Sequence, residues 1–179
     1  MSASRVLVTA ASRHESTMEI ASAIGVELAR AGLEVQVHPV DEVRDLDGAD
    51  AVVLGSGVYM GRWLPPALDF AARNRDALRA RPLWLFSSGP TGAPPTPAED
   101  DTADLSELTD DLGARAHRIF PGRLDRRRLG FGERAVVGVV RARDGDFRPW
   151  PEIVAWADGI AASLAERTGG DLKDHGGVR

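Results

Sequence analysis

Hydroxyl-bearing residues lie between the first strongly apolar segment of the chain and a segment with helical periodicity. Residues 5–11 (RVLVTAA) are followed by residues 12–17 (SRHEST), here called the first loop. Backbone N–H groups in the first turn of a helix have no partner within the helix and lie at the positive end of its dipole. Such a turn binds anions, and Ser12, Ser16 and Thr17 would add hydroxyl donors. The spacing therefore predicts an anion site, with phosphate as the default ligand.

Two further loops of small residues follow later apolar segments. The second loop is residues 55–63 (GSGVYMGRW), and the third loop is residues 87–92 (SSGPTG). Glycines let backbone approach a ligand closely, and Tyr59 and Trp63 could cover a flat ring. Each loop alone is compatible with ordinary turn chemistry. In a parallel sheet, however, ligands bind outside the carboxyl ends of the strands, so all three loops would meet at one edge. Together they describe a mononucleotide site.

Hydropathy patterns predict the elements that position these loops. Nearly continuous apolar runs at 5–10, 51–56 and 83–88 predict strands buried on both faces of a parallel sheet. Alternation at 34–38 predicts an edge strand, and 118–120 is a short fifth candidate. Helical spacing predicts helices over 64–79 and from Pro151 onward, whereas 131–142 fits a helix or a strand. A further helix is expected between the strands at 5–10 and 34–38, with the capping-box pattern Ser16-x-x-Glu19 at its start. Alternating strands and helices indicate an α/β fold with a parallel sheet covered on both faces.

The overall composition narrows the class of protein. The 179 residues suit a single domain over 1–168, with 93–111 an acidic, Pro-rich surface insertion carrying at most a short helix, and 169–179 a flexible tail. A net charge of −5 argues against nucleic acid as a partner. The absence of cysteine excludes disulfides, thiol catalysis and iron–sulfur clusters, so a redox role would need an organic cofactor. The histidines have no metal-ligand spacing, so no metal is expected. No apolar segment approaches the roughly 18 residues of a membrane span, and a cytoplasmic location is expected.

The three loops also carry a family resemblance. Residues 11–17 (ASRHEST) resemble the phosphate loop Ala-Ser-(Lys/Arg)-His-Gly-(Ser/Ala/Gln)-Thr of flavodoxin-domain proteins, in the branch of the flavodoxin-like, quinone-linked protoporphyrinogen oxidases. Residues 55–61 and 86–92 resemble the second and third flavin loops of that branch, and 145–150 (GDFRPW) its C-terminal signature. The resemblance covers roughly residues 5–166. It implies a flavodoxin-like three-layer α/β/α sandwich with a five-stranded parallel sheet of order 2-1-3-4-5.

What the resemblance implies for function is non-covalent binding of FMN and electron transfer. The partner would be a redox protein, a quinone or another small-molecule electron donor or acceptor. Carried over by position, the FMN-binding residues are those of the phosphate loop (Ser12, Arg13, His14, Ser16 and Thr17), of the ring-flanking loop (Ser56, Gly57, Val58 and Tyr59), and of the loop at the pyrimidine edge (Ser88, Gly89, Thr91 and Gly92). No catalytic side chain is required, because the flavin carries the chemistry. A basic turn at Arg123 and 126–128 is either solvated or attracts a carboxylated substrate such as a porphyrin.

One residue departs from the family pattern, because Glu15 stands where the family has glycine. If the position needs a positive φ, a non-glycine residue costs about 1–2 kcal/mol. A carboxylate ~4 Å from the phosphate adds about 1 kcal/mol of repulsion in water and about 4 kcal/mol at intermediate dielectric. Three hypotheses therefore stay open: an FMN-binding oxidoreductase or electron carrier, a quinone-linked protoporphyrinogen oxidase, and a degenerate domain without flavin that serves as an interaction module.

Overall fold

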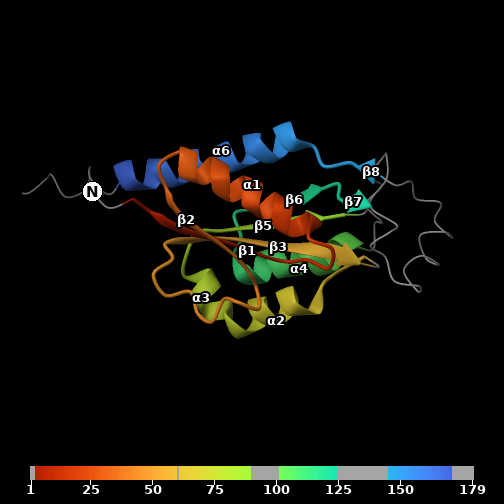
Figure 1. Cartoon of the computed structure of the whole chain (residues 1–179). Helices are drawn as coiled ribbons and strands as arrows, with labels where there is room; N and C mark the ends of the chain where they lie inside the picture. The colour runs from red at the N-terminus through yellow and green to blue at the C-terminus, as the bar shows by residue number, and fades with distance from the viewer. Residues whose placement is uncertain (1–2, 60, 90–100, 125–144, 171–179) are drawn as a thin grey trace, which may run out of the picture.

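The central feature of the computed structural model is a parallel β-sheet (Figure 1). The structure describes residues 3–59, 61–89, 101–124 and 145–170. Five parallel strands lie in the order β2-β1-β3-β5-β6. Their bounds are β1 Arg5–Ala11, β2 Glu34–Pro39, β3 Ala51–Tyr59, β5 Leu83–Ser88 and β6 Ala116–Phe120. Because β5 and β6 are the fourth and fifth parallel strands along the chain, the predicted order 2-1-3-4-5 is confirmed.

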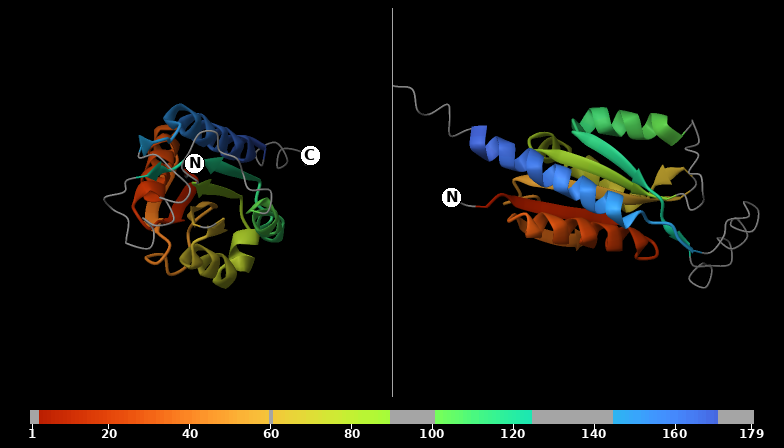
Figure 2. Two further views of the ribbon diagram at one scale, coloured as in Figure 1. Left: turned by 90° about the vertical axis from the view of Figure 1, so that its right-hand side faces the viewer. Right: turned by 90° about the horizontal axis from the view of Figure 1, so that it is seen from above.

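Helices cover both faces of the sheet, which gives the predicted three-layer sandwich (Figures 1 and 2). One face carries α1 Ser16–Arg30 and α6 Trp150–Gly170, and the other carries α2 Pro65–Arg73, α3 Arg75–Arg79 and α4 Asp101–Leu112. Alternate residues of β1 supply the two cores: Val8 packs in the cluster with Ile24 and Ile153, and Leu7 in the cluster with Phe70. The continuous apolar runs of β1, β3 and β5 are thus explained by burial on two faces.

A glycine in β3 allows close packing on the neighbouring strand. A Cβ atom on Gly55 would lie 2.1 Å from a ring carbon of Phe86. The Phe86 ring therefore lies directly against the β3 backbone, where it also contacts Trp156 of α6 in an edge arrangement with ring centroids 6.3 Å apart. The missing side chain lets an aromatic ring fill the space between sheet and helix.

Several element boundaries differ from the predictions. The helix expected over 64–79 is divided at Asn74 into α2 and α3. β3 continues to Tyr59 and pairs with a short antiparallel strand, β4 Arg62–Trp63, so much of the second loop is a hairpin. The acidic stretch 93–111, expected to hold at most a short helix, contributes most of the 12-residue helix α4. Leu105 and Leu112 on this helix are buried, because their spacing puts both on the face toward the sheet while the carboxylates lie elsewhere.

The C-terminal part of the chain forms a second small sheet that was not predicted. β7 Arg123–Leu124 pairs antiparallel with β8 Gly145–Asp146, directly before α6. Pro151 lies in the first turn of α6 as expected, and the helix extends to Gly170, two residues into the stretch expected to be a tail. The segments 126–128, 131–142 and 171–179, on which further predictions were made, lie outside the described residues. Within the described part of the chain, no helix is both long and apolar enough to cross a bilayer.

Candidate functional site

The first and second loops meet at the carboxyl edge of the sheet. The first loop connects β1 to α1, and Thr17 in the first turn of α1 is buried. The Thr17 N–H donates to Oγ of Ser12 at 3.3 Å, which closes the turn. A Cβ on Gly57 would lie 3.2 Å from Oγ1 of Thr17, so the end of β3 lies against this turn. Glycine at position 57 is what permits the close approach.

The third loop joins the same edge. Gly89, directly after β5, has φ +112°, and a Cβ there would lie 3.5 Å from the carbonyl oxygen of Val58. The Gly89 N–H donates to the carbonyl oxygen of Phe120 at 2.9 Å, which ties the loop to β6. The contacts of Thr17 with Gly57 and of Val58 with Gly89 therefore bring residues from the three loops together along one edge, with Ser88 buried next to Gly89. Thr91 and Gly92, also expected here, lie outside the described residues.

The residue before α1 adopts a left-handed backbone conformation. Glu15 has φ 64° and ψ −19°, and among the described residues it is the one non-glycine with positive φ. The side chain itself is exposed. Glu15 is the N-cap of α1 and makes no side-chain capping hydrogen bond. Glu15 stands where the resembled family has glycine, and the backbone at this position has the positive φ that glycine adopts most easily.

The predicted capping box is wrong, because the left-handed turn at Glu15 places Ser16 inside the helix rather than at its cap. Oγ of Ser16 instead accepts a hydrogen bond at 3.2 Å from the backbone N–H of Arg123, at the start of β7. The Glu19 carboxylate, expected to reach back to the N-terminus, pairs with two arginines. Its Oε1 lies 3.6 Å from Nη1 of Arg123, and its Oε2 accepts from Nη1 of Arg148.

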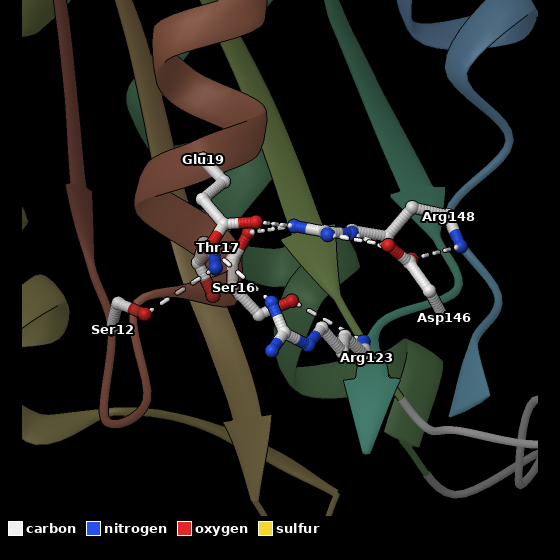
Figure 3. A network of polar contacts seen from close by, with 7 residues as sticks. All are labelled: Ser12, Ser16, Thr17, Glu19, Arg123, Asp146 and Arg148. Carbon is white, nitrogen blue, oxygen red and sulfur yellow. Dashed lines mark hydrogen bonds and ion pairs between the residues drawn. The ribbon is translucent and has the colours of Figure 1, made fainter. Parts of the chain in front are cut away.

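Arg148 forms the centre of a polar network around the start of α1 (Figure 3). Its side chain is only 3% exposed. Nε donates to Oδ1 of Asp146 at 2.7 Å and Nη2 donates to Oδ2 at 2.6 Å, a bidentate pair. The hydrogen bonds from Arg148 hold the pKa of Asp146 below its usual value, against the opposing effect of partial burial. The sequence reasoning did not find this network; its only signal was the resemblance of residues 145–150 to a family signature.

Arg13 and Tyr59 link the first loop to the second. The Arg13 guanidinium carbon lies 4.4 Å from the centroid of the Tyr59 ring, a cation–π contact. Tyr59 and Val58 are half-buried at the end of β3, and His14 is half-buried in the first loop. An aromatic ring therefore lies beside the first loop.

Two residues expected to face a ring are instead part of the core. Ser56 is fully buried; its Oγ accepts from the Leu64 N–H at 3.0 Å and donates to the Gly57 carbonyl at 2.8 Å, so its hydroxyl fixes the connection to α2. Trp63, a candidate ring cover from its sequence position, is 3% exposed, because the β3–β4 hairpin turns it inward.

The buried Trp63 belongs to a hydrogen-bonded chain that links β4, β5 and β6. Its Nε1 donates to Oγ of Ser87 at 2.7 Å, and the same Oγ lies 2.8 Å from Nε2 of His117. Burial lowers the pKa of His117. The Ser87 hydroxyl thus bonds to both rings, and the tautomer of His117 decides whether Nε2 accepts from Ser87 or donates to it.

The residues of this edge fit a phosphate group. Ser12, Ser16 and Thr17 supply hydroxyls, and the turn lies at the N-terminus of a 15-residue helix. Two amides in the turn are already engaged, since the Ser16 N–H donates to His14 O at 2.8 Å and the Thr17 N–H to Ser12. The hydroxyl groups therefore contribute much of the donor set. Among the described residues no group of three or more His, Cys, Asp or Glu side chains could hold a metal ion.

Solved structures define the class of fold. The chain is similar to rubredoxin:oxygen oxidoreductase from Desulfovibrio gigas (TM-score 0.64, 14% identity), with 92% of this chain matching 37% of that one. It is also similar to a flavodoxin from the domain Archaea (TM-score 0.59, 20% identity, 90% of this chain and 99% of the other). A flavodoxin from Streptococcus pneumoniae TIGR4 matches with TM-score 0.57 and 18% identity, over 92% and 99% of the two chains. The architecture is the flavodoxin fold.

Family membership rests on the sequence itself. The family model described as flavodoxin domain matches residues 7–148, well over half of the chain. The protein belongs to the flavodoxin domain family. A search of curated proteins found no match. This match assigns the family and does not distinguish the protoporphyrinogen oxidase branch within it.

Proposed function

We propose that this protein binds FMN at the edge where the three loops meet and serves as a flavodoxin-like electron-transfer protein or oxidoreductase. The observation that carries the proposal is the contact of Gly57 with Thr17, which brings the second loop against the first turn of α1. Membership of the flavodoxin domain family supports it.

The residues divide into those that bind phosphate and those that bind the ring. The hydroxyls of Ser12, Ser16 and Thr17 bind the phosphate together with backbone amides of residues 13–15, since the amides of Ser16 and Thr17 donate within the turn. Val58 and Tyr59 flank the ring, and the third loop with Ser88 and Gly89, together with Thr91 and Gly92, lies at its polar edge. Ser56 acts through the shape of the loop, since its own hydroxyl is engaged.

The bound flavin supplies one- or two-electron redox chemistry, and the chain supplies binding, orientation and exclusion of water. No side chain of the site is required as an acid or base. The electron donor or acceptor is a redox partner protein or a small molecule such as a quinone, and we place the protein in the cytoplasm.

A titration tests the proposal directly. The apoprotein is added to FMN, and quenching of flavin fluorescence is measured. We expect saturable quenching, and Thr17→Ala should weaken binding about tenfold, since a hydrogen bond to a charged group contributes about 1.5 kcal/mol and ~1.4 kcal/mol is tenfold. Protein that stays colourless and shows no quenching at high micromolar FMN would overturn it.

A second candidate is an interaction module that binds no flavin. The strained backbone of Glu15 favours it, because this residue departs from glycine where φ is positive. Glu15→Gly decides between the two: strong FMN binding that appears only in the variant means that the native site has lapsed.

The third candidate, quinone-linked oxidation of protoporphyrinogen, rests on the resemblance of the three loops and of residues 145–150 to that branch, and no residue is assigned to the reaction. In its favour, Arg148 of this segment contacts Ser16 and Glu19 at the start of α1, beside the proposed flavin site. Porphyrin fluorescence measured with menaquinone as acceptor tests it, and absence of turnover leaves electron transfer alone.

A further inference from the structure

Arg148 is a buried cation that the proposed FMN site does not use directly. A buried charge is stable only when it is paired and hydrogen-bonded. Arg148 satisfies this with Asp146 on its own segment and with Glu19 on α1, and its guanidinium also lies over the Trp150 ring at 4.5 Å. It therefore joins two segments that are about 130 residues apart in the sequence.

The contacts on α1 fall on the first turn, which is the part of the helix that faces the anion site. Nη1 of Arg148 donates to the Glu19 carboxylate and lies 3.5 Å from the carbonyl oxygen of Ser16. β7, which pairs with β8, adds the hydrogen bond from the Arg123 N–H to Oγ of Ser16. Figure 3 shows these groups converging on Ser16 and Glu19 from one side, with Ser12 and Thr17 beside them.

The same contacts offset the negative charge of Glu19 in the first turn of α1. A bare Glu19 carboxylate in the first turn would repel a phosphate dianion at the same helix end. Arg148 and Arg123 both lie on Glu19, and Asp146 holds the planar guanidinium in one orientation by a bidentate contact. The turn thus keeps a fixed shape and a balanced charge without Arg148 reaching the ligand.

We propose that Arg148 is a positioning residue for phosphate recognition, an inference that rests on the proposed FMN function. Through Glu19 and the Ser16 carbonyl it holds the first turn of α1 in the geometry that receives the phosphate. Its effect is therefore confined to the phosphate end of the ligand and does not extend to the ring.

The experiment compares two flavins on the full-length protein. FMN and riboflavin share the ring, and only FMN carries the phosphate. Dissociation constants for both are measured by fluorescence quenching for the wild type, Arg148→Gln and Asp146→Asn. We expect FMN binding to weaken about tenfold in Arg148→Gln, equivalent to about 1.4 kcal/mol, with riboflavin binding within about twofold of the wild type. Asp146→Asn keeps the cation but loosens its orientation, and should shift FMN binding in the same direction by a smaller factor.

Arg75→Gln is the matched control. Arg75 also makes a two-nitrogen contact with an aspartate, Asp111, but this pair joins α3 to α4 and its side chains are about half exposed. Its removal should leave both dissociation constants unchanged. Circular dichroism and hydrogen exchange of the amides of residues 17–20 in the apoprotein confirm that the variants are folded and report loosening of the turn, which we expect in Arg148→Gln and not in Arg75→Gln.

The possible outcomes separate this inference from the function on which it rests. A wild type that binds FMN, with equal weakening of FMN and riboflavin in Arg148→Gln, overturns the positioning role and keeps the FMN proposal. Unchanged FMN binding in Arg148→Gln and Asp146→Asn also overturns the positioning role and keeps the FMN proposal. A wild type that binds neither flavin overturns the proposed function and this inference with it.

Discussion

The backbone at Glu15 gives the most direct test of how this chain departs from a glycine-containing phosphate loop. Glu15 holds φ 64°, in the left-handed region, and its side chain is exposed. A residue with a Cβ pays about 1–2 kcal/mol there relative to glycine. Replacement by glycine relieves this strain but gives the unfolded chain more freedom, which costs about 0.5–1 kcal/mol.

The net effect of Glu15→Gly is therefore a gain of about 0–1.5 kcal/mol in the free energy of unfolding, centred on ~0.75 kcal/mol. For a domain of this size the central value raises Tm by about 1–4 °C. Glu15→Gln is the matched control, because it removes the negative charge and keeps both the side chain and the strain. It should leave Tm close to the wild-type value.

Ligand affinity responds to charge rather than to strain, provided that the turn has the same shape with and without ligand. An exposed carboxylate ~4 Å from a phosphate charge contributes about 1 kcal/mol of repulsion in water, which is about fivefold in affinity. Both variants should therefore bind FMN about fivefold more tightly at low salt, and the gain should shrink at high salt as the charges are screened.

The assay is a pair of measurements on each variant: thermal unfolding of the apoprotein, and FMN fluorescence quenching at two ionic strengths. A Tm for Glu15→Gln that rises as far as that of Glu15→Gly would refute the strain argument, because glutamine has the same backbone restriction. Equal FMN affinity in all three proteins at low salt would refute the repulsion argument.

Three further predictions concern the core beneath the site. Gly55→Ala places a Cβ 2.1 Å from a ring carbon and should destabilise the fold by about 3 kcal/mol in urea unfolding, whereas Gly159→Ala, in α6 with nothing within 4 Å, should stabilise it by about 0.5–1 kcal/mol. Trp63→Phe removes the N–H bonded to Ser87 and should lower the free energy of unfolding by about 1–3 kcal/mol; a change below 0.5 kcal/mol, roughly the level of a neutral surface substitution, would contradict the role of that bond. Burial lowers the pKa of His117 in the fold, so the unfolded chain binds the proton more readily; stability is full above pH ~6.5 and falls as the pH drops from there to the folded pKa. His117→Gln should flatten this part of the curve of unfolding free energy against pH, and an unchanged slope would contradict it.

The local parts of the fold could be predicted because each rests on a short-range pattern. Continuous apolar residues gave the buried strands β1, β3 and β5, and the fold then required their carboxyl ends to share one edge. The three loops were located for that reason. The prediction for residues 93–111 was wrong because their many carboxylates indicate a solvated loop. Leu105 and Leu112, at helical spacing, are buried on one face of α4.

Side-chain partners could not be predicted in the same way. Ser56 and Trp63 stand in a glycine-rich loop that looks suited to a ligand, yet a hairpin turns Trp63 into the core and a helix start engages Ser56. Glu19 has the spacing of a capping residue and is drawn away by two arginines. Such outcomes depend on which groups, far apart in the sequence, lie close enough in the folded chain to form hydrogen bonds.

The sequence by itself determined the sheet, its order through the family resemblance, and the location of the loop that we propose binds an anion. Strand burial and helix starts can be predicted because each depends on the pattern of neighbouring residues. Only the tertiary structure decided that Arg148 contacts the first turn of α1, that Gly57 lies against Thr17, and that Glu15 is left-handed. Those facts depend on segments brought together by the packing of the whole domain, and hydrophobic periodicity carries no information about which polar groups will meet.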